Sequence, residues 1–328
     1  SAIKGATVLS GYMDGALKLD DNVLIDEPLK FAGTPEINSV FNKRAGNRIS
    51  LNDIEALERS SNVYMSKVAL RMGGRDSYSR NQALKIDSGP VLTRLRDYFS
   101  QFGLGVPTGI DLPSESKGLP GVDGNKFMYF AFGQYDTYTT MQLAQYASTI
   151  ANNGKRMGLH LVDEIWSTGE DGELGKIESQ IEPKLLNTVN VEQKIMDRVH
   201  QGFYKVVNGN LGTAHSRLGG TPYVSAGKTG TAQSSYYEGE GSPNNGASTI
   251  NKTYVGYAPY EDPEIAIAVV VPYLPGNNTN YQSQIAAKKV LDAYFHEGAY
   301  ANKANELQDE YKNNEDSETE NDLDAETE

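Results

Sequence analysis

The sequence predicts an α+β fold in which an antiparallel sheet is flanked by helices. Apolar residues recur at helical spacing in most segments of the first two thirds of the chain. Between residues 223 and 271 the pattern changes to short runs rich in β-branched and aromatic residues, which are typical of strands. Helices that come first and strands that come later are expected in an α+β domain.

Glycine and threonine mark the ends of the expected helices. Residues 1–15 are mostly apolar and stop at Gly15, and Gly73 closes a later helix. Thr139 or Thr140 is the expected cap of a strong amphipathic helix that Gly154 ends. The expected helices cover residues 1–15, 51–59, 63–72, 91–102, 141–153, 191–207 and 283–296.

Three strands are expected near the end of the chain, at residues 223–233, 254–257 and 264–271. The stretch Ser234–Lys252 is rich in glycine, asparagine and serine, which predicts a long loop between the first two strands. The apolar run that ends before Pro272 is far shorter than the roughly 20 residues of a membrane-spanning helix. Its β-branched residues favour a buried strand.

Composition separates an ordinary domain from an acidic end. The formal net charge is −13, and residues 306–328 contain eleven acidic residues and one lysine, which leaves −3 for the remainder. We therefore expect a domain over residues 1–298 and a disordered acidic tail over residues 299–328. Cysteine is absent, which excludes disulfides and thiolate metal sites. No basic patch indicates nucleic-acid binding, and the scattered histidines do not have the spacing of metal ligands.

Three short motifs carry candidate chemistry: Ser1-Ala2-Ile3-Lys4, Ser60-Ser61-Asn62 and Lys228-Thr229-Gly230-Thr231. Residues three apart lie on one face of a helix, so the first motif brings a lysine near a serine hydroxyl. The second motif falls at the joint between two expected helices, and the third falls on an expected strand. A hydroxyl nucleophile needs a base, a proton relay and an anion-binding strand, and these motifs can supply all three.

The lysine of the first motif can act as a base only when it is neutral. Its reference pKa of about 10.4 must therefore be lowered, and burial together with a second cation at Lys228 would do so. Ser60 could then pass a proton to a leaving amine. Asn62 offers an amide that can hold both Lys4 and a substrate backbone.

The third motif suits the edge of a sheet. Gly230 lacks a side chain where a substrate backbone must approach closely, and Lys228, Thr229 and Thr231 together can bind a terminal carboxylate. An extended peptide could add to this edge as a further strand. The backbone N–H groups of Ser1 and Thr231 would then stabilise the oxyanion of an acyl-transfer reaction.

In their order and context the three motifs are similar to those of penicillin-recognising serine acyltransferases. Longer stretches extend the similarity, and on them the chain from Ser1 to about His296 resembles the transpeptidase domain of class B penicillin-binding proteins, above all the 2B-like proteins of Gram-positive bacteria. These stretches are Phe102–Gly105, Thr108–Pro113, Ala131–Gln134, Met141–Ala144, Ile150–Gly154 and Val255–Pro259.

The resemblance implies a serine β-lactamase-like fold and a peptidoglycan D,D-transpeptidase activity. Ser1 would be the acylated nucleophile and Lys4 its base, Ser60 and Asn62 would form the second site, and Lys228–Thr231 would form the substrate-binding strand. Stem peptides would be the substrates, β-lactams would acylate the same serine, and no cofactor is expected. The family also implies a membrane glycosyltransferase partner and a single-pass anchor in the cell membrane with an extracellular catalytic domain.

Other functions share some of these features. A serine β-lactamase or a penicillin sensor has the same fold and motifs, and Glu182–Asn187 superficially resembles a deacylating loop, although a strand edge begun by Pro183 is the favoured interpretation. An N-terminal-nucleophile hydrolase would also begin with serine but leaves Lys4 unexplained. A non-catalytic cell-wall scaffold is the alternative outside enzymes.

The family places sheet strands and further domains before the nucleophile, and the printed sequence begins at that residue. We therefore expect a transpeptidase domain truncated at its active-site serine, with the N-terminal strands missing. The 328-residue chain on its own is predicted neither to fold stably nor to react with penicillin. Stoichiometric labelling of Ser1 in the isolated chain by a fluorescent penicillin would contradict this expectation.

Overall fold

The computed structural model describes residues 1–169, 172–239 and 241–298. It divides into two compact units, residues 1–284 and residues 285–328. The boundary falls within helix α9 (Gln282–Tyr294). The acidic tail predicted at residues 299–328 lies outside the described residues.

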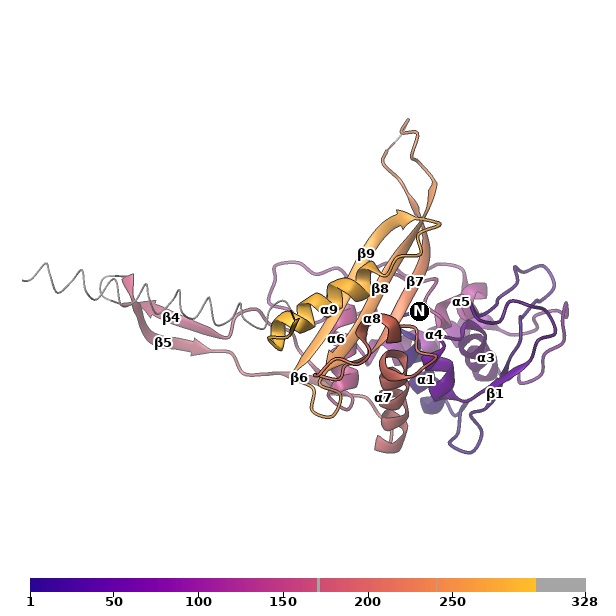
Figure 1. Ribbon diagram of the computed structural model, residues 1–328, viewed down its shortest axis with the longest axis horizontal. Coiled ribbons are helices and arrows are strands. Elements are labelled where there is room, and N and C mark those ends of the chain that lie inside the picture. Colours follow the sequence, from indigo (N-terminus) through magenta and orange to yellow (C-terminus); the bar gives the residue numbers. More distant parts are fainter. Residues whose placement is uncertain (170–171, 240, 299–328) are drawn as a thin grey trace, which may run out of the picture. The chain divides into compact units, whose positions relative to one another are not determined.

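The first unit contains a three-stranded antiparallel sheet, as the sequence predicted (Figure 1). Its strands are β7 (Ala226–Tyr236), β8 (Ala247–Ala258) and β9 (Ile265–Pro275), in the order β7-β8-β9. Most residues of β9 are half-buried, and of the run 265–271 only Ile267 is fully buried, which corrects the expectation of a buried strand. Strand β9 pairs on one side only, which explains its partial exposure.

The predicted loop at Ser234–Lys252 is wrong. Strands β7 and β8 continue to the pair Tyr236↔Ala247, so the connection is confined to residues 237–246. Cross-strand contacts such as Ser234 Oγ to Thr249 Oγ1, at 2.8 Å, stabilise this polar part of the hairpin. The polar composition that indicated a loop belongs to a ribbon in which most side chains are exposed or half-buried, and polar residues suit such a strand equally well.

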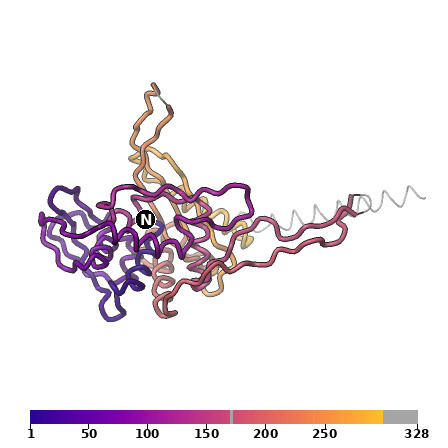
Figure 2. Tube along the Cα trace, turned by 180° about the vertical axis from the view of Figure 1, so that it is seen from behind, coloured from indigo at the N-terminus to yellow at the C-terminus, as the bar shows by residue number. Residues whose placement is uncertain are grey.

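Helix α1 (Lys4–Met13) runs through the middle of the first unit, and nearly all of its residues are buried. It contacts α3 (Asn62–Met72), α4 (Ser88–Ser100) and α7 (Gln193–Asn208), while α6 (Thr140–Ala151) packs against β8 and β9. Gly5 permits this crowding, because a Cβ there would lie 2.6 Å from the Tyr146 hydroxyl oxygen and 2.9 Å from the Phe203 ring. The start of the chain is thereby held inside the unit (Figure 2).

The helix ends follow local sequence signals. Thr139 caps α6, and its capping box with Gln142 satisfies two backbone N–H groups at once. Asn52 forms the same arrangement at the start of α2 (Asp53–Glu58). The predicted helices 51–59, 63–72, 91–102, 141–153 and 191–207 all correspond to helices of the structure within a few residues at each end.

Several short elements were not expected. The β4–β5 hairpin extends away from the rest of the first unit (Figures 1 and 2), and most of its side chains are exposed. Among the described residues, no helix combines the length and apolar character needed to cross a bilayer. The unexpected elements are β1 (Leu24–Asp26), β2 (Ile49–Leu51), β3 (Lys155–Met157), β4 (Glu164–Thr168), β5 (Leu174–Gln180), η1 (Gly124–Lys126), α5 (Phe127–Ala131) and α8 (His215–Leu218). Strand β6 (Leu185–Thr188) lies where a strand begun by Pro183 was predicted.

Candidate active site

The second motif occupies the junction between α2 and α3. Ser60 follows the end of α2 in the left-handed region, with φ of 55°, and the N–H groups of Ser60 and Ser61 close the helix on the carbonyls of Leu57 and Ala56. This pattern usually has glycine at the left-handed position, so serine is strained there by about 1–3 kcal/mol. Ser61 then caps α3 by accepting a hydrogen bond from Tyr64 N at 2.8 Å. Both helices therefore fix the Ser60 backbone.

The hydroxyl of Ser60 joins the first and third motifs. Lys4 Nζ donates to Ser60 Oγ at 3.0 Å and to the Ser60 carbonyl at 2.8 Å. From the sheet side, Lys228 Nζ donates to the same Oγ at 2.8 Å. Both lysine side chains are fully buried. Lys4 and Lys228 lie 56 and 168 positions from Ser60 in the sequence, and both bind the same Ser60 oxygen atom.

Burial is the main reason that both lysines lose protons easily. It lowers the pKa of Lys228 to about 7. Burial also lowers the pKa of Lys4, the nearby charge of Lys228 lowers it further, and Asp26 opposes the shift. The two ammonium groups repel each other, so loss of a proton from one of them stabilises the charge on the other. The pair can therefore hold one neutral amine beside one charged amine.

Asn62 holds the Lys4 amine in place. Its Oδ1 accepts from Lys4 Nζ at 2.7 Å, and its Nδ2 donates to the Asn38 carbonyl at 3.1 Å. These two contacts fix which end of the amide faces the lysine. The second N–H of the amide is left for the open side of the site, where Asn62 lines a cleft.

A buried carboxylate that sequence reasoning missed supports the second motif. Asp26, on β1, accepts hydrogen bonds from the hydroxyls of Ser61 and Ser39 and, at 3.0 Å, from Asn42 Nδ2. Ser39 Oγ in turn accepts from Asn62 N at 3.1 Å. Asp26 therefore fixes the start of α3 and, through it, the amide that holds Lys4. No motif includes Asp26, so no local pattern marks it as a site residue.

A cleft of about 960 Å³ is lined by Ser60, whose hydroxyl binds both lysines, but by neither lysine itself. The motif residues that line it are Ser1, Ser60, Asn62, Thr229, Gly230 and Thr231. Ser1 forms the turn before α1, where its carbonyl accepts from Lys4 N at 3.3 Å. Within the described residues the Ser1 hydroxyl has no hydrogen-bond partner, and Lys4 Nζ bonds to Ser60 and Asn62 instead.

Strand β7 borders the other side of the cleft. A Cβ at Gly230 would lie 3.0 Å from Ala2 N, so glycine lets the strand approach the start of the chain closely. The Thr229 hydroxyl is 2.7 Å from the hydroxyl of Thr213, a cleft residue that sequence reasoning also missed. Two hydroxyls beside a buried cationic lysine form a suitable cradle for a carboxylate.

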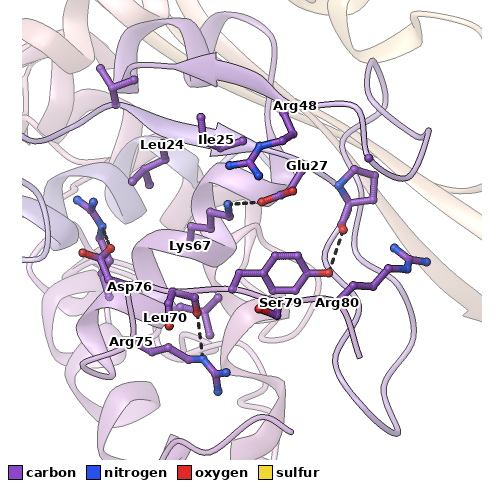
Figure 3. Close-up of a pocket in the computed structure, with 16 residues that line it drawn as sticks. Leu24, Ile25, Glu27, Arg48, Lys67, Leu70, Arg75, Asp76, Ser79 and Arg80 are labelled. Atoms are coloured by element: carbon purple, nitrogen blue, oxygen red, sulfur yellow. Dashed lines mark hydrogen bonds and ion pairs between the residues drawn. The ribbon is translucent and has the colours of Figure 1, made fainter. Parts of the chain in front are cut away.

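A second cavity, of about 470 Å³, lies beside β1 and α3 (Figure 3). Arginine and lysine side chains line it, but carboxylates oppose most of them: Lys67 faces Glu27 at 3.4 Å, and Arg71 pairs with Asp21 at 3.2 Å. None of the motif residues lines this cavity. Among the described residues, no group of three or more metal-ligating side chains is found. The cleft between α1, the α2–α3 junction and β7 is therefore the candidate active site.

Comparison with known proteins gives consistent matches. A family model described as the penicillin binding protein transpeptidase domain matches residues 1–294. Penicillin-binding protein 2A of Bacillus subtilis (strain 168) is 42% identical over 300 residues, which are 90% of this chain and 40% of that protein. Penicillin-binding protein 2B of Streptococcus pneumoniae (strain D39) is 38% identical over 299 residues, 90% of this chain and 42% of that protein.

Solved structures match the fold as well. The structure of penicillin-binding protein 2B from Streptococcus pneumoniae (strain R6) superposes with a TM-score of 0.80 and 36% identity, covering 90% of this chain and 46% of that chain. This match confirms the predicted fold class. The chain spans less than half the length of the relatives that it matches.

Asp26→Ala is expected to lower the free energy of unfolding by about 3 kcal/mol, because it removes the buried carboxylate that accepts from the hydroxyls of Ser61 and Ser39. Urea unfolding of the natively expressed protein measures this loss. Asp21→Ala is the matched control: it removes an exposed partner of Arg71 and should cost less than about 1 kcal/mol. Equal losses in the two variants would show that Asp26 does not anchor the junction.

Proposed function

Because this chain belongs to the penicillin-binding protein transpeptidase family, we propose that it supplies the acyl-transfer site of a peptidoglycan D,D-transpeptidase that β-lactams also acylate. One observation carries the proposal: the Ser60 hydroxyl bonds to two fully buried lysines, and Ser60 lines the same cleft as Ser1. A neutral amine, a relay hydroxyl and a fixed cation are the parts that serine acylation requires.

In the proposed first step the Ser1 oxygen attacks the carbonyl carbon of the penultimate D-alanine of a stem peptide. The hydroxyl proton passes to neutral Lys4, which Asn62 and Ser60 hold in position. The charge that develops on the carbonyl oxygen is stabilised by the backbone N–H groups of Ser1 and Thr231. The tetrahedral intermediate collapses when the bond to the terminal D-alanine breaks.

Ser60 is the proposed route for the proton to that leaving amine. Lys228 Nζ donates to its oxygen and Lys4 Nζ lies 3.0 Å from the same atom, so Ser60 can relay a proton from Lys4 to the amine. Transfer of the Ser60 hydrogen to the amine and of the Lys4 proton to Ser60 restores the protonation states of both side chains and leaves Ser1 acylated. An amine of a neighbouring stem peptide then attacks the acyl-enzyme by the reverse sequence, forms the cross-link and releases Ser1.

The third motif is proposed to hold the donor. Charged Lys228 and the hydroxyls of Thr229 and Thr213 would bind the terminal carboxylate, while Gly230 lets the peptide backbone lie against β7. The arrangement places a cation near the end of the donor that leaves. A β-lactam carboxylate would bind the same groups.

A β-lactamase or penicillin sensor would use the same site, but the structure offers it no deacylating residue from the suspected loop. Glu182 lies in an exposed segment before β6 and does not line the cleft. A wall scaffold without catalysis would not need two buried lysines with lowered pKa values at one hydroxyl. The proposal extends to a membrane glycosyltransferase as partner and to an anchored protein whose catalytic domain lies outside the cell membrane.

Ser1→Ala is expected to abolish covalent labelling by fluorescent penicillin, and Lys4→Arg to slow labelling by about 10³-fold or more, because a guanidinium cannot discharge near neutral pH. Lys18→Arg, at an exposed position, is the control and should label normally. The assay uses the natively expressed protein with a gel readout. Labelling of Lys4→Arg at the wild-type rate would rule out Lys4 as the base. An acyl-enzyme that clears in well under a second would instead indicate a β-lactamase.

The rate of acylation should depend on pH through both lysines. Below the pKa of Lys4 the amine is protonated and the rate falls, whereas above about 7 Lys228 loses the charge that binds the substrate carboxylate. Lys228→Met should move the acid limb to higher pH, because loss of the neighbouring charge raises the pKa of Lys4. The check is a pH profile of kcat/KM for both proteins. An acid limb that stays in place would show that the two lysines are not coupled.

A further inference from the structure

The outer edge of β7 is closed by a side chain at one point. Gln233 N donates to Gln134 Oε1 at 3.0 Å, and Gln134 Nε2 donates to the Gln233 carbonyl at 2.9 Å. Both backbone groups of Gln233 therefore face away from β8. Because the register between β7 and β8 is continuous from Ala226 to Tyr236, the backbone groups of Thr231 and Thr229 face the same open edge.

Gln134 occupies the place that a partner strand would take. In an antiparallel ladder a residue exchanges two hydrogen bonds, one through its N–H and one through its carbonyl, with the residue opposite. The side-chain amide of Gln134 forms both of these bonds with Gln233. A peptide that adds to the edge cannot pair with Gln233 while this amide remains there.

The other end of the open edge is also occupied. Lys228 Nζ donates to the Thr229 carbonyl at 3.1 Å, and the Thr229 hydroxyl contacts Thr213. On the edge of β7 between Thr229 and Gln233, only Thr231 has an outward N–H and an outward carbonyl that both lack a hydrogen-bond partner among the described residues. The edge thus offers full backbone pairing to a single residue of an added peptide.

We propose that Gln134 determines how far the donor peptide pairs with β7, a specificity role that rests on the proposed transpeptidase function. With the donor carboxylate at Thr229, the preceding residues run past Thr231 toward Gln233. The distance from Thr231 to Gln233 is about 7 Å at roughly 3.4 Å per residue. The donor therefore leaves the edge after one paired residue, and residues further upstream can be bulky or branched without loss of pairing.

The test compares thioester analogues of the donor that differ in the number of residues before the reacting carbonyl. For the natively expressed protein, kcat/KM should stop rising once the donor reaches the residue that pairs with Thr231. In Gln134→Ala the backbone of Gln233 is free to pair with the donor. The kcat/KM of a donor long enough to reach Gln233 should therefore rise by about tenfold, the gain expected from one or two added backbone hydrogen bonds. Gln134→Asn is the substitute if Gln134→Ala does not fold. Its amide is too short to reach Gln233, so the same rise in kcat/KM is expected.

Two variants serve as controls. Gln134→Glu keeps the bulk at the edge and the acceptor for Gln233 N–H but loses the donor to the Gln233 carbonyl, so its dependence on donor length should lie between those of the original protein and Gln134→Ala. Gln193→Ala removes an exposed glutamine on α7 that also makes two side-chain hydrogen bonds. This variant should leave the dependence of kcat/KM on donor length unchanged.

An unchanged length profile in both Gln134→Ala and Gln134→Asn would overturn the proposal. So would a loss of penicillin acylation in these variants of more than about tenfold, since Gln134 would then organise the reacting groups themselves. Failure of the transpeptidase function has a separate signature, because the unaltered protein would then not be labelled at Ser1 by penicillin at all.

Discussion

Two fully buried lysines share the hydroxyl of Ser60, and the positions of the other site residues follow from this contact. Two ammonium groups donating to one neutral oxygen in a buried site repel each other, and burial penalises both charges. The arrangement is stable only when one amine is neutral. The same contact therefore explains why a lysine can serve as a base and why the other can remain a cation for an anionic substrate.

The fold brings three distant segments to this oxygen. Helix α1 is buried among its neighbours and carries Lys4, the sheet edge carries Lys228, and the α2–α3 junction carries Ser60 in a conformation that serine seldom adopts. Helix-ending hydrogen bonds on one side and the cap at Ser61 on the other hold that conformation. Asp26 adds a buried acceptor beneath the junction, so the strain at Ser60 is supported by bonds that do not involve substrate.

The sequence predicted the parts of this structure that depend on local signals. The helices were found because caps such as Thr139 and stops such as Gly154 act within one turn, and the antiparallel sheet is confirmed. The hairpin at Ser234–Lys252 was misread because a polar ribbon has the composition of a loop. Asp26 was missed, and Gln134 was noted only as part of a stretch that carries the resemblance. Their partners Ser61 and Gln233 lie 35 and 99 residues away, and no local pattern encodes such contacts. The catalytic roles of the motif residues remain proposals.

The charge state of Lys4 tests the account most directly. Nitrogen-15 NMR of lysine-labelled protein, with the Lys4 signal assigned through Lys4→Arg, can follow the Nζ atom through a pH titration. We expect Lys4 to titrate well below 10.5, because burial and the nearby charge of Lys228 lower its pKa. A Lys4 signal that titrates near 10.5 would contradict the neutral amine on which the proposed chemistry depends.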